Sequence, residues 1–433
     1  RQLRRPPSWW HRPSPLALPE ATSGSGRLST FRTSHRATGR AFGGSGAASE
    51  AWAMPRILLP STRRPGAIWQ TAPLLRQGKS MADLEEELDA DEGMHIDVAS
   101  GGEMHVALAA GVPASRLVLH GNNKSGHELR VAMEQGVHRI VVDSFDELDR
   151  IESLVAEGLH APAVLLRITP GVEAHTHEFI QTGQDDSKFG FGVRAGHAQE
   201  AIARAQQSAS INLVGLHAHV GSQVFDVSSF EKVIEVLAPI FNPLGLEELC
   251  IGGGLGVAYV EGERSDGLVE WGESIRRACA AHEVTARITA EPGRAIIASA
   301  AVTLYTSGTI KEIPGVRTYV SVDGGMSDNP RPVLYGSGYE TFLPRAVSEP
   351  REAVVRLVGK HCESGDLLVR EGRLPADYAV GDLVATPVTG AYGYALGSNY
   401  NKVPRPAVVF VSDGVATEVV RRETWDDLLR LDL

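Results

Sequence analysis

From about residue 94 the chain alternates short apolar runs with segments of helical periodicity. The short runs are apolar nearly throughout, as in strands that are buried on both faces. Helical periodicity fills the intervals, for example Glu103–Ala110, Ser125–Gln135 and Phe145–Glu157. Strands that alternate with helices predict a parallel sheet. Seven strands are predicted: His95–Ala99, Arg116–His120, Arg139–Asp143, Val164–Thr169, Leu213–His219, Leu249–Gly252 and Arg287–Ala290.

Several of these runs end in a polar residue, which is where barrel enzymes place their chemistry. No GxGxxG motif follows a first strand, so nothing favours an open dinucleotide-binding sheet. We therefore expect an α/β fold, a (β/α)₈ TIM-type barrel over residues 94–300. Only seven βα units are recognisable, so the first strand is missing or degenerate. The polar ends are Asp97, His120, Asp143, Arg167, His219 and Glu291.

The texture changes again at about Ala301. Apolar runs are now separated by Gly, Pro and Asp turns, and helical periodicity is weak until the last few residues. This pattern predicts a mostly β C-terminal domain over residues 301–433. Its expected strands are Ala301–Thr306, Thr318–Val322, Val354–Val358, Leu383–Thr386, Ala407–Val411 and Val415–Arg421.

The formal charge of −11 is unevenly distributed over the 433 residues. Residues 1–80 hold twelve Arg and one Lys against two Glu, so the remaining residues carry −22. An acidic chain argues against nucleic acid or acidic membranes as partners, and no apolar run is long enough to cross a bilayer. Three cysteines cannot form a disulfide framework, which favours the cytoplasm. The sequence contains neither a CxxC nor an HExxH spacing, so no metal site is predicted.

Residues 1–93 are atypical. They are rich in Pro, Ser, Gly and Arg, show neither helical nor strand periodicity, and contain four of the six Trp residues of the chain. Three interpretations are open. The segment could be a transit peptide, a disordered tail, or the product of the wrong reading frame of GC-rich DNA. In each case we expect the recognisable enzyme to begin near residue 94.

Two glycine-containing turns suggest an anion site. The stretches 251-IGGGLG-256 and 291-EPGR-294 each follow a predicted strand. Consecutive glycines let backbone N–H groups approach an anion closely. Two such turns on neighbouring barrel strands are typical of a phosphate site, although both could also be purely structural turns.

Three further stretches contain candidate functional residues. In 214-VGLHAHVGSQ-223, His217 and His219 have the same side-chain parity, and Ser222 offers a small hydroxyl suited to a phosphate. In 360-KHCESGD-366, Cys362 lies between basic and acidic neighbours, so it is either an exposed reactive thiol or a buried structural one. The Gly- and Asn-rich segments 323–335 and 389–401 add Arg331, Tyr335 and Tyr392 as possible anion binders.

Taken in order, these motifs resemble the fold-type III pyridoxal-phosphate decarboxylases, and among them the diaminopimelate decarboxylase family, in its actinobacterial branch. The resemblance covers residues 94–433. It implies pyridoxal 5′-phosphate as cofactor and decarboxylation of meso-2,6-diaminopimelate to L-lysine and CO₂, the last step of lysine biosynthesis. An ornithine- or arginine-type decarboxylase and an inactive homologue remain as alternatives. The matching stretches are IDVASGGE (96–103), HGNNKS (120–125), GVEAHTHEF (171–179), KFGF (188–191), GLHAHVGSQ (215–223), GGGLG (252–256), EPGR (291–294), SVDGGMSDN (321–329), KHCESGD (360–366), TGAYGY (389–394) and YNKVPRPAVV (400–409).

The resemblance also implies roles for individual residues. Glu291 would face the pyridine nitrogen, His219 would stack on the ring, and Cys362 would return a proton after CO₂ leaves. The other implied cofactor-binding residues are Ser222, Gly254, Pro292, Gly293, Arg294 and Tyr392. The implied binders of the amino-acid substrate are Arg294, Arg331, Tyr335, Glu363 and Tyr392.

In this family the Cys-bearing loop reaches the active site of the other subunit. The resemblance therefore implies a homodimer with shared active sites.

One feature departs from the family pattern. The family carries its Schiff-base lysine in a Tyr-Ala-x-Lys-Ala motif on the first barrel strand. Lys79 precedes Asp97 by 18 positions, one fewer than the family spacing, but it stands in RQGKS with no apolar strand before it. Three hypotheses follow: Lys79 binds the cofactor, the chain lacks that lysine and is inactive, or the first strand with its lysine is encoded in another reading frame of the same DNA.

Overall fold

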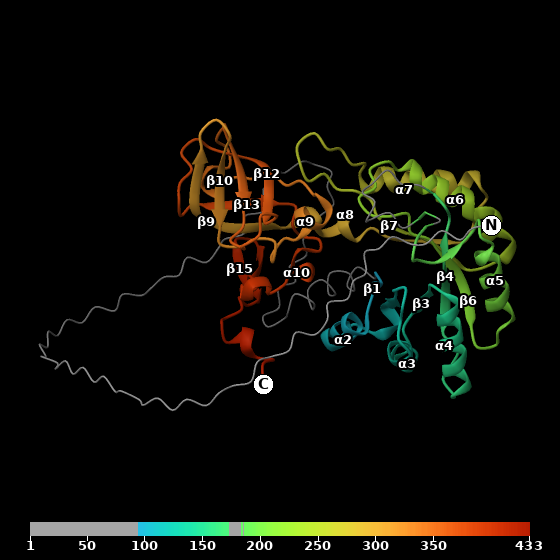
Figure 1. Ribbon diagram of the computed structural model, residues 1–433. Helices are drawn as coiled ribbons and strands as arrows, with labels where there is room; N and C mark the ends of the chain where they lie inside the picture. Colours follow the sequence, from blue (N-terminus) through green and yellow to red (C-terminus); the bar gives the residue numbers. More distant parts are fainter. Residues whose placement is uncertain (1–93, 173–182, 185) are drawn as a thin grey trace, which may run out of the picture. The chain divides into compact units, whose positions relative to one another are not determined.

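A curved parallel sheet forms the first half of the computed structural model, which describes residues 94–172, 183–184 and 186–433 (Figure 1). Its strands follow the order β1-β2-β3-β4-β6-β7-β8, each parallel to its neighbour, with the two-residue β5 (Phe191–Gly192) beside β4. This confirms the seven predicted strands. They are β1 (Ile96–Val98), β2 (Leu117–Leu119), β3 (Arg139–Val142), β4 (Ala163–Thr169), β6 (Asn212–His217), β7 (Glu248–Gly253) and β8 (Arg287–Glu291).

Helices connect the strands, and three of them begin in the same way. Ser100, Ser125 and Ser144 are N-caps whose side chains accept the backbone N–H three residues later, and a glutamate stands at that position each time. The Ser-x-x-Glu spacing therefore sets where these helices start. The helices are α2 (Gly101–Ala110), α3 (Gly126–Gln135), α4 (Phe145–Ala156), α5 (His197–Gln207), α6 (Ser228–Phe241) and α7 (Leu268–Ala281).

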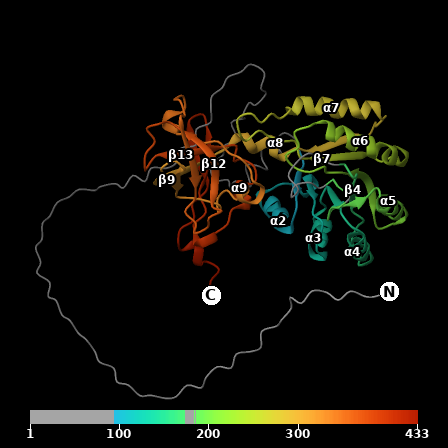
Figure 2. The same cartoon turned by 45° about the horizontal axis from the view of Figure 1, so that its top comes forward.

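The strands bury both of their faces, as their composition predicts. On β2, Leu117 and Leu119 pack in the large cluster shared with the helices, whereas Val118 between them belongs to a small cluster on the other face. Figures 1 and 2 show the helices along one face of the sheet. The small cluster on this other face consists of Val118, Val141, Leu165, Val214 and Cys250, and Ala163 packs against it. Both faces therefore demand apolar side chains, which explains the continuous apolar runs.

The sheet path ends at β1 and β8. Within the described residues no strand pairs with the outer edge of either one. Arg287 and Ala290 on β8 are exposed, whereas β4 in the middle of the sheet is buried along nearly its whole length. The described chain thus contains the seven barrel strands expected and not an eighth. Lys79 lies outside the described residues.

The second half is mostly β, as predicted. A five-stranded sheet has the order β12-β11-β10-β9-β13, and β14 and β15 form a separate hairpin. One strand, β12, was missed, because the charged pair Arg370-Glu371 interrupts its apolar run. The pairing of β12 with β11 is irregular at this point, because Arg370 and Glu371 together lie opposite Arg356, and both are exposed. The strands are β9 (Val302–Ile313), β10 (Arg317–Val322), β11 (Ala353–Val358), β12 (Leu367–Leu374), β13 (Leu383–Pro387), β14 (Val408–Ser412) and β15 (Val415–Val420).

Short helices α8 (Gly293–Ile297), α9 (Arg331–Tyr335) and α10 (Gly393–Leu396) interrupt the connections of this half of the chain. None of the helices in the described ranges has the length and apolar character needed to cross a membrane.

A fully buried carboxylate joins two strand ends of the barrel. Glu147 accepts hydrogen bonds from the backbone N–H of Lys124, from the Lys124 ammonium and from the backbone N–H of Asp143, each at 2.9 Å. Lys124 Nζ also donates to the carbonyl of Gly121 at 2.6 Å. The loop after β2 and the end of β3 are therefore held together by one side chain that water does not reach.

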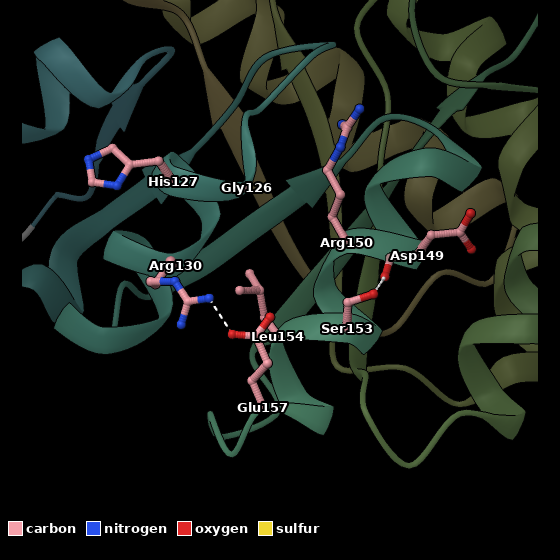
Figure 3. Close-up of a pocket in the computed structure, with 8 residues that line it drawn as sticks. All are labelled: Gly126, His127, Arg130, Asp149, Arg150, Ser153, Leu154 and Glu157. Carbon is pink, nitrogen blue, oxygen red and sulfur yellow. Dashed lines mark hydrogen bonds and ion pairs between the residues drawn. The ribbon is translucent and has the colours of Figure 1, made fainter.

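A groove between α3 and α4 offers an exposed ion pair for comparison (Figure 3). Arg130 and Glu157 form this pair across the groove, and their side chains are 36% and 55% exposed. The residues that line the groove include none of the predicted site residues. They are Gly126, His127, Arg130, Asp149, Arg150, Ser153, Leu154 and Glu157.

We predict that Glu147→Ala lowers the free energy of unfolding by about 3–5 kcal/mol, because it leaves the buried Lys124 ammonium without its counter-charge. Urea denaturation of the full chain measures the change. Glu157→Ala is the matched control and should leave stability nearly unchanged, since solvent screens that pair. Equal effects of the two substitutions would contradict a structural role for the Glu147 carboxylate.

Candidate active site

Side chains from β6, β7 and the residue after β2 meet at a single carboxylate, that of Glu291 at the end of β8. His217, which ends β6, places Nε2 3.1 Å from Oε1 and 3.2 Å from Oε2 of Glu291. His120, directly after β2, places Nε2 3.5 Å from Glu291 Oε1 and 3.2 Å from Oδ1 of Asp97 on β1. The thiol of Cys250 on β7 donates to Glu291 Oε1 at 3.2 Å.

These neighbours keep Glu291 ionised. Burial by itself would raise its pKa, but the charges of His217 and His120 and the hydrogen bond from His217 outweigh burial and hold the pKa far below its usual range. Burial raises the pKa of the Cys250 thiol well above its ordinary value, so Cys250 remains a donor. The site therefore presents a buried, negatively charged acceptor at the carboxyl end of the sheet.

His219 lies beside this group but has a different partner. The backbone N–H of Gly253 donates to its Nδ1 at 3.2 Å. Burial, reinforced by the nearby positive charge of Arg167, lowers the pKa of His219 to about 3. Its imidazole is therefore neutral at physiological pH.

The turn after β7 closely approaches two neighbouring backbones. A Cβ added to Gly254, which has φ +103°, would lie 2.0 Å from the carbonyl oxygen of Gly221. A Cβ added to Gly253 would lie 1.8 Å from the carbonyl oxygen of Glu291. Only glycine fits at these positions, so the glycines of the sequence motif are required by packing.

Arg294 is buried next to this turn. Its guanidinium donates to Ser222 Oγ and to the Tyr259 hydroxyl, both at 2.7 Å, while its Nε is buried without a hydrogen-bond partner. Since β7 and β8 are neighbours, the two predicted turns do lie side by side. A glycine turn, a hydroxyl and a guanidinium with a spare donor form a suitable donor set for a phosphate group.

Aromatic rings connect Arg294 with a second arginine. Arg294 lies 4.9 Å from the centre of the Tyr392 ring, and Arg331 lies 5.2 Å from that of Tyr259 and 5.4 Å from that of Tyr335. Tyr392 itself has φ +63°, a left-handed conformation that is costly for a tyrosine and fixes the direction of its side chain. Two buried guanidiniums thus flank a shared aromatic surface.

The structure therefore brings together most of the predicted cofactor and substrate residues. The joined group comprises His219, Ser222, Gly254, Glu291, Pro292, Gly293, Arg294, Arg331, Tyr335 and Tyr392. Among the described residues, the contacts that join this group include neither Cys362 nor Glu363.

Cys362 and Glu363 belong to a loop that the β domain organises by itself. The Asp366 carboxylate accepts the backbone N–H of Met326 at 2.7 Å and that of His361 at 2.8 Å. Cys362 is exposed, so its thiol is accessible and not a buried structural one. The side chain of Glu363 accepts a hydrogen bond from the Tyr400 hydroxyl.

The sequence reasoning missed some contributors. Tyr259 hydrogen-bonds to Arg294 and packs edge-on against Tyr339, but a single tyrosine after a glycine turn gives no local signal. The sequence predicts His217 as a strand histidine but not its partner, since Glu291 is 74 positions away. For His120 the sequence indicates only a polar residue at the end of a strand.

Comparisons with known proteins agree with this fold. A family model described as pyridoxal-dependent decarboxylase, pyridoxal binding domain, matches residues 86–298. The barrel sheet, the β domain and this match define the class: the protein is a pyridoxal-dependent decarboxylase of fold type III.

Individual relatives narrow the class. Diaminopimelate decarboxylase of Bacillus subtilis strain 168 is 47% identical over 360 residues, covering 80% of this chain and 81% of that protein. The enzyme of the same name from Mycobacterium tuberculosis H37Rv is 46% identical over 363 residues, covering 79% and 81%. The chain belongs to the diaminopimelate decarboxylase family.

Solved structures resemble it as well. Diaminopimelate decarboxylase from Helicobacter pylori, complexed with L-lysine, has a TM-score of 0.73 at 31% identity, covering 82% of this chain and 88% of that one. The enzyme from M. jannaschii, in co-complex with L-lysine, has a TM-score of 0.74 at 33% identity, covering 82% and 83%.

The neutral state of His219 leads to a prediction about acid stability. An unfolded histidine takes up a proton near pH 6.5, whereas folded His219 does so only near pH 3. Stability from this residue is therefore complete above about pH 6.5 and declines as the pH falls toward 3. We expect His219→Asn to reduce the loss of unfolding free energy between about pH 7 and pH 5, measured by urea denaturation.

The exposed His105 on α2 supplies the control, because His105→Asn should preserve the wild-type pH dependence. An unchanged pH dependence in His219→Asn would show that the folded and the unfolded imidazole take up a proton in the same pH range, which contradicts the lowered pKa of His219.

Proposed function

We propose that this chain catalyses the pyridoxal-phosphate-dependent decarboxylation of meso-2,6-diaminopimelate to L-lysine and CO₂. Family membership supports the reaction. The observation that carries the proposal is the pairing of a buried, ionised Glu291 with the Arg294–Ser222 group on the neighbouring turn. An acceptor for a protonated ring nitrogen and a donor set for a phosphate are the two ends that pyridoxal phosphate requires.

The cofactor would be bound at both of these ends. Arg294, Ser222 and the turn at Gly254 would bind its phosphate, with Pro292, Gly293 and Tyr392 around them, and Glu291 would keep a proton on the ring nitrogen. Bound pyridoxal phosphate supplies the electron sink for the bond that breaks when CO₂ leaves. His219 is neutral, so it can pack against the ring without a charge that competes with the pyridinium.

Substrate recognition would use the second arginine. Arg331 is buried, and Tyr339 and Ser337 accept hydrogen bonds from it at 3.2 Å, so its guanidinium is oriented in advance. With Tyr335 it would bind a substrate carboxylate through parallel hydrogen bonds. Glu363 would bind the distal ammonium of diaminopimelate. Ornithine and arginine also carry a distal cation but lack a second carboxylate, so a distal carboxylate bound by Arg331 would favour diaminopimelate.

Cys362 would be the proton donor. It is exposed, and it stands in a loop whose backbone is fixed by Asp366. A thiol placed over the carbon that has lost CO₂ can return the proton there, a general-acid step. As this loop belongs to the β domain, we further propose that it serves the site of a second subunit in a cytoplasmic homodimer.

We expect the full chain, supplied with pyridoxal phosphate, to release CO₂ and L-lysine from meso-diaminopimelate. Cys362→Ala should lower kcat by about 10²–10⁴-fold with little change in KM, because proton return follows binding. Cys279→Ala on helix α7 is the matched control and should retain activity. Turnover of ornithine or arginine without turnover of diaminopimelate would refute the substrate assignment.

If the chain shows no decarboxylase activity in this assay, one more measurement is needed. Borohydride reduction followed by peptide mapping locates any lysine bonded to the cofactor. A pyridoxyl adduct on Lys79 would exclude the inactive-homologue hypothesis, and cofactor binding without any adduct would support it.

Shared sites predict complementation between two inactive variants. Cys362→Ala and Glu291→Gln each disable every site of their own homodimer. In a mixed dimer, one site combines an intact Cys362 with an intact Glu291. We expect mixing by reversible dissociation to restore about one quarter of wild-type activity. No recovery in mixtures that exchange subunits, shown by a tag on one variant, would mean that each site is built from a single chain.

A further inference from the structure

Three metal-ligating side chains converge in the barrel, and we call them the His–His–Glu cluster: His120, His217 and Glu291. Their ligand atoms all lie within 4.8 Å of one another. They come from the ends of three different strands, so the convergence results from the curvature of the sheet and not from a local sequence motif. The cluster has neither a CxxC nor an HExxH spacing, and for this reason the sequence alone predicted no metal site.

The distances suit a tetrahedral ion. Around zinc, nitrogen and oxygen ligands lie at about 2.0–2.2 Å, which places neighbouring ligand atoms about 3.3 Å apart. Glu291 Oε1 lies 3.1 Å from His217 Nε2 and 3.5 Å from His120 Nε2. Two of the three pairs thus already have nearly the spacing of a coordination shell, and the third pair, the two imidazole nitrogens, lies within 4.8 Å.

The surroundings meet a further requirement of a metal site. Water can complete the coordination of an ion held by three protein ligands. Asp97 lies 3.2 Å from His120 Nε2, and its side chain is 43% exposed, whereas that of His217 is 1% exposed. The cluster is therefore enclosed on the His217 side and reachable from solvent beside Asp97, which provides an entry path.

We propose that the His–His–Glu cluster binds one divalent transition-metal ion of the zinc class when the cofactor ring is not bound. As the ion binds, each imidazole would give up its Nε2 proton to solvent and present the Nε2 lone pair with a proton on Nδ1, and Glu291 would bind as a carboxylate. The ion takes the carboxylate that the proposed function assigns to the cofactor ring, so metal and cofactor compete. This competition, but not the metal site itself, rests on the proposed function.

Cobalt(II) is the probe, because four-coordinate cobalt absorbs visible light while aqueous cobalt does so only weakly. We expect the cofactor-free full chain to bind one equivalent with a visible band. Loss of a residue that only supports a metal ligand typically lowers metal affinity by about tenfold or more. Loss of a ligand itself should cost at least as much, so His120→Asn and His217→Gln should each weaken cobalt binding by about tenfold or more.

His105→Asn on α2 is the matched control and should bind cobalt as the wild type does. Since His217 is fully buried, its variant could fail to fold, and His120→Asn at the more open side then decides. Equal cobalt affinity in His120→Asn, His105→Asn and wild type would overturn the proposal, as would the absence of a visible band.

Competition with pyridoxamine 5′-phosphate separates this proposal from the proposed function. This compound carries the same ring and phosphate but needs no lysine to bind. Cobalt binding that depends on His120 and weakens as pyridoxamine phosphate is added supports both. If cobalt affinity depends on His120 but does not change when pyridoxamine phosphate binds, the metal site is supported and the placement of the ring at Glu291 is contradicted. If pyridoxamine phosphate binds normally and cobalt affinity is the same in His120→Asn as in wild type, the metal site is contradicted and the proposed function is supported.

Discussion

The ionised carboxylate of Glu291 is the constraint on which the architecture of the site depends. Moving a carboxylate out of water costs several kcal/mol unless donors replace the water. Here His217 and Cys250 form hydrogen bonds with the carboxylate, and the imidazole of His120 faces it at 3.5 Å. No single strand could supply three such neighbours, so the charge is tolerated because the curved sheet brings β6, β7 and the residue after β2 to the end of β8.

A second buried charge follows only three positions later in the chain. Arg294 donates to Ser222 and Tyr259, while Glu291 contacts histidines, and the two do not form an ion pair with each other. The rigid Pro292-Gly293 turn separates them. The result is a site with a negative end and a positive end, a polarity that matches a protonated ring nitrogen and a phosphate and that an internal salt bridge would have cancelled.

Much of this fold could be predicted because its signals are local. The apolar runs marked all seven barrel strands, and the Ser-x-x-Glu pattern coincides with the starts of α2, α3 and α4. β12 was missed because Arg370-Glu371 interrupts its apolar run at a point where its pairing with β11 is irregular. The partners of the site residues could not be predicted, since His217 and Glu291 are distant in sequence and meet only through the strand order. The motifs identified which residues matter, but only the tertiary structure shows that Tyr259 links Arg294 to Arg331.

The two outer edges of the barrel sheet set a last physical condition on the chemistry. Ala290 on β8 and Asp97 on β1 are exposed in strands whose counterparts in the middle of the sheet are buried. Both positions adjoin residues that contact the central carboxylate, because Ala290 precedes Glu291 and Asp97 touches His120. Within the described residues, His217 and Cys250 occupy other sides of the carboxylate. The aldehyde carbon of pyridoxal phosphate stands across the ring from its nitrogen, so a Schiff-base lysine would act on the far side of the ring from Glu291. The contacts around Glu291 therefore fix the nitrogen end of the cofactor, while the choice between an active and an inactive enzyme depends on the opposite end.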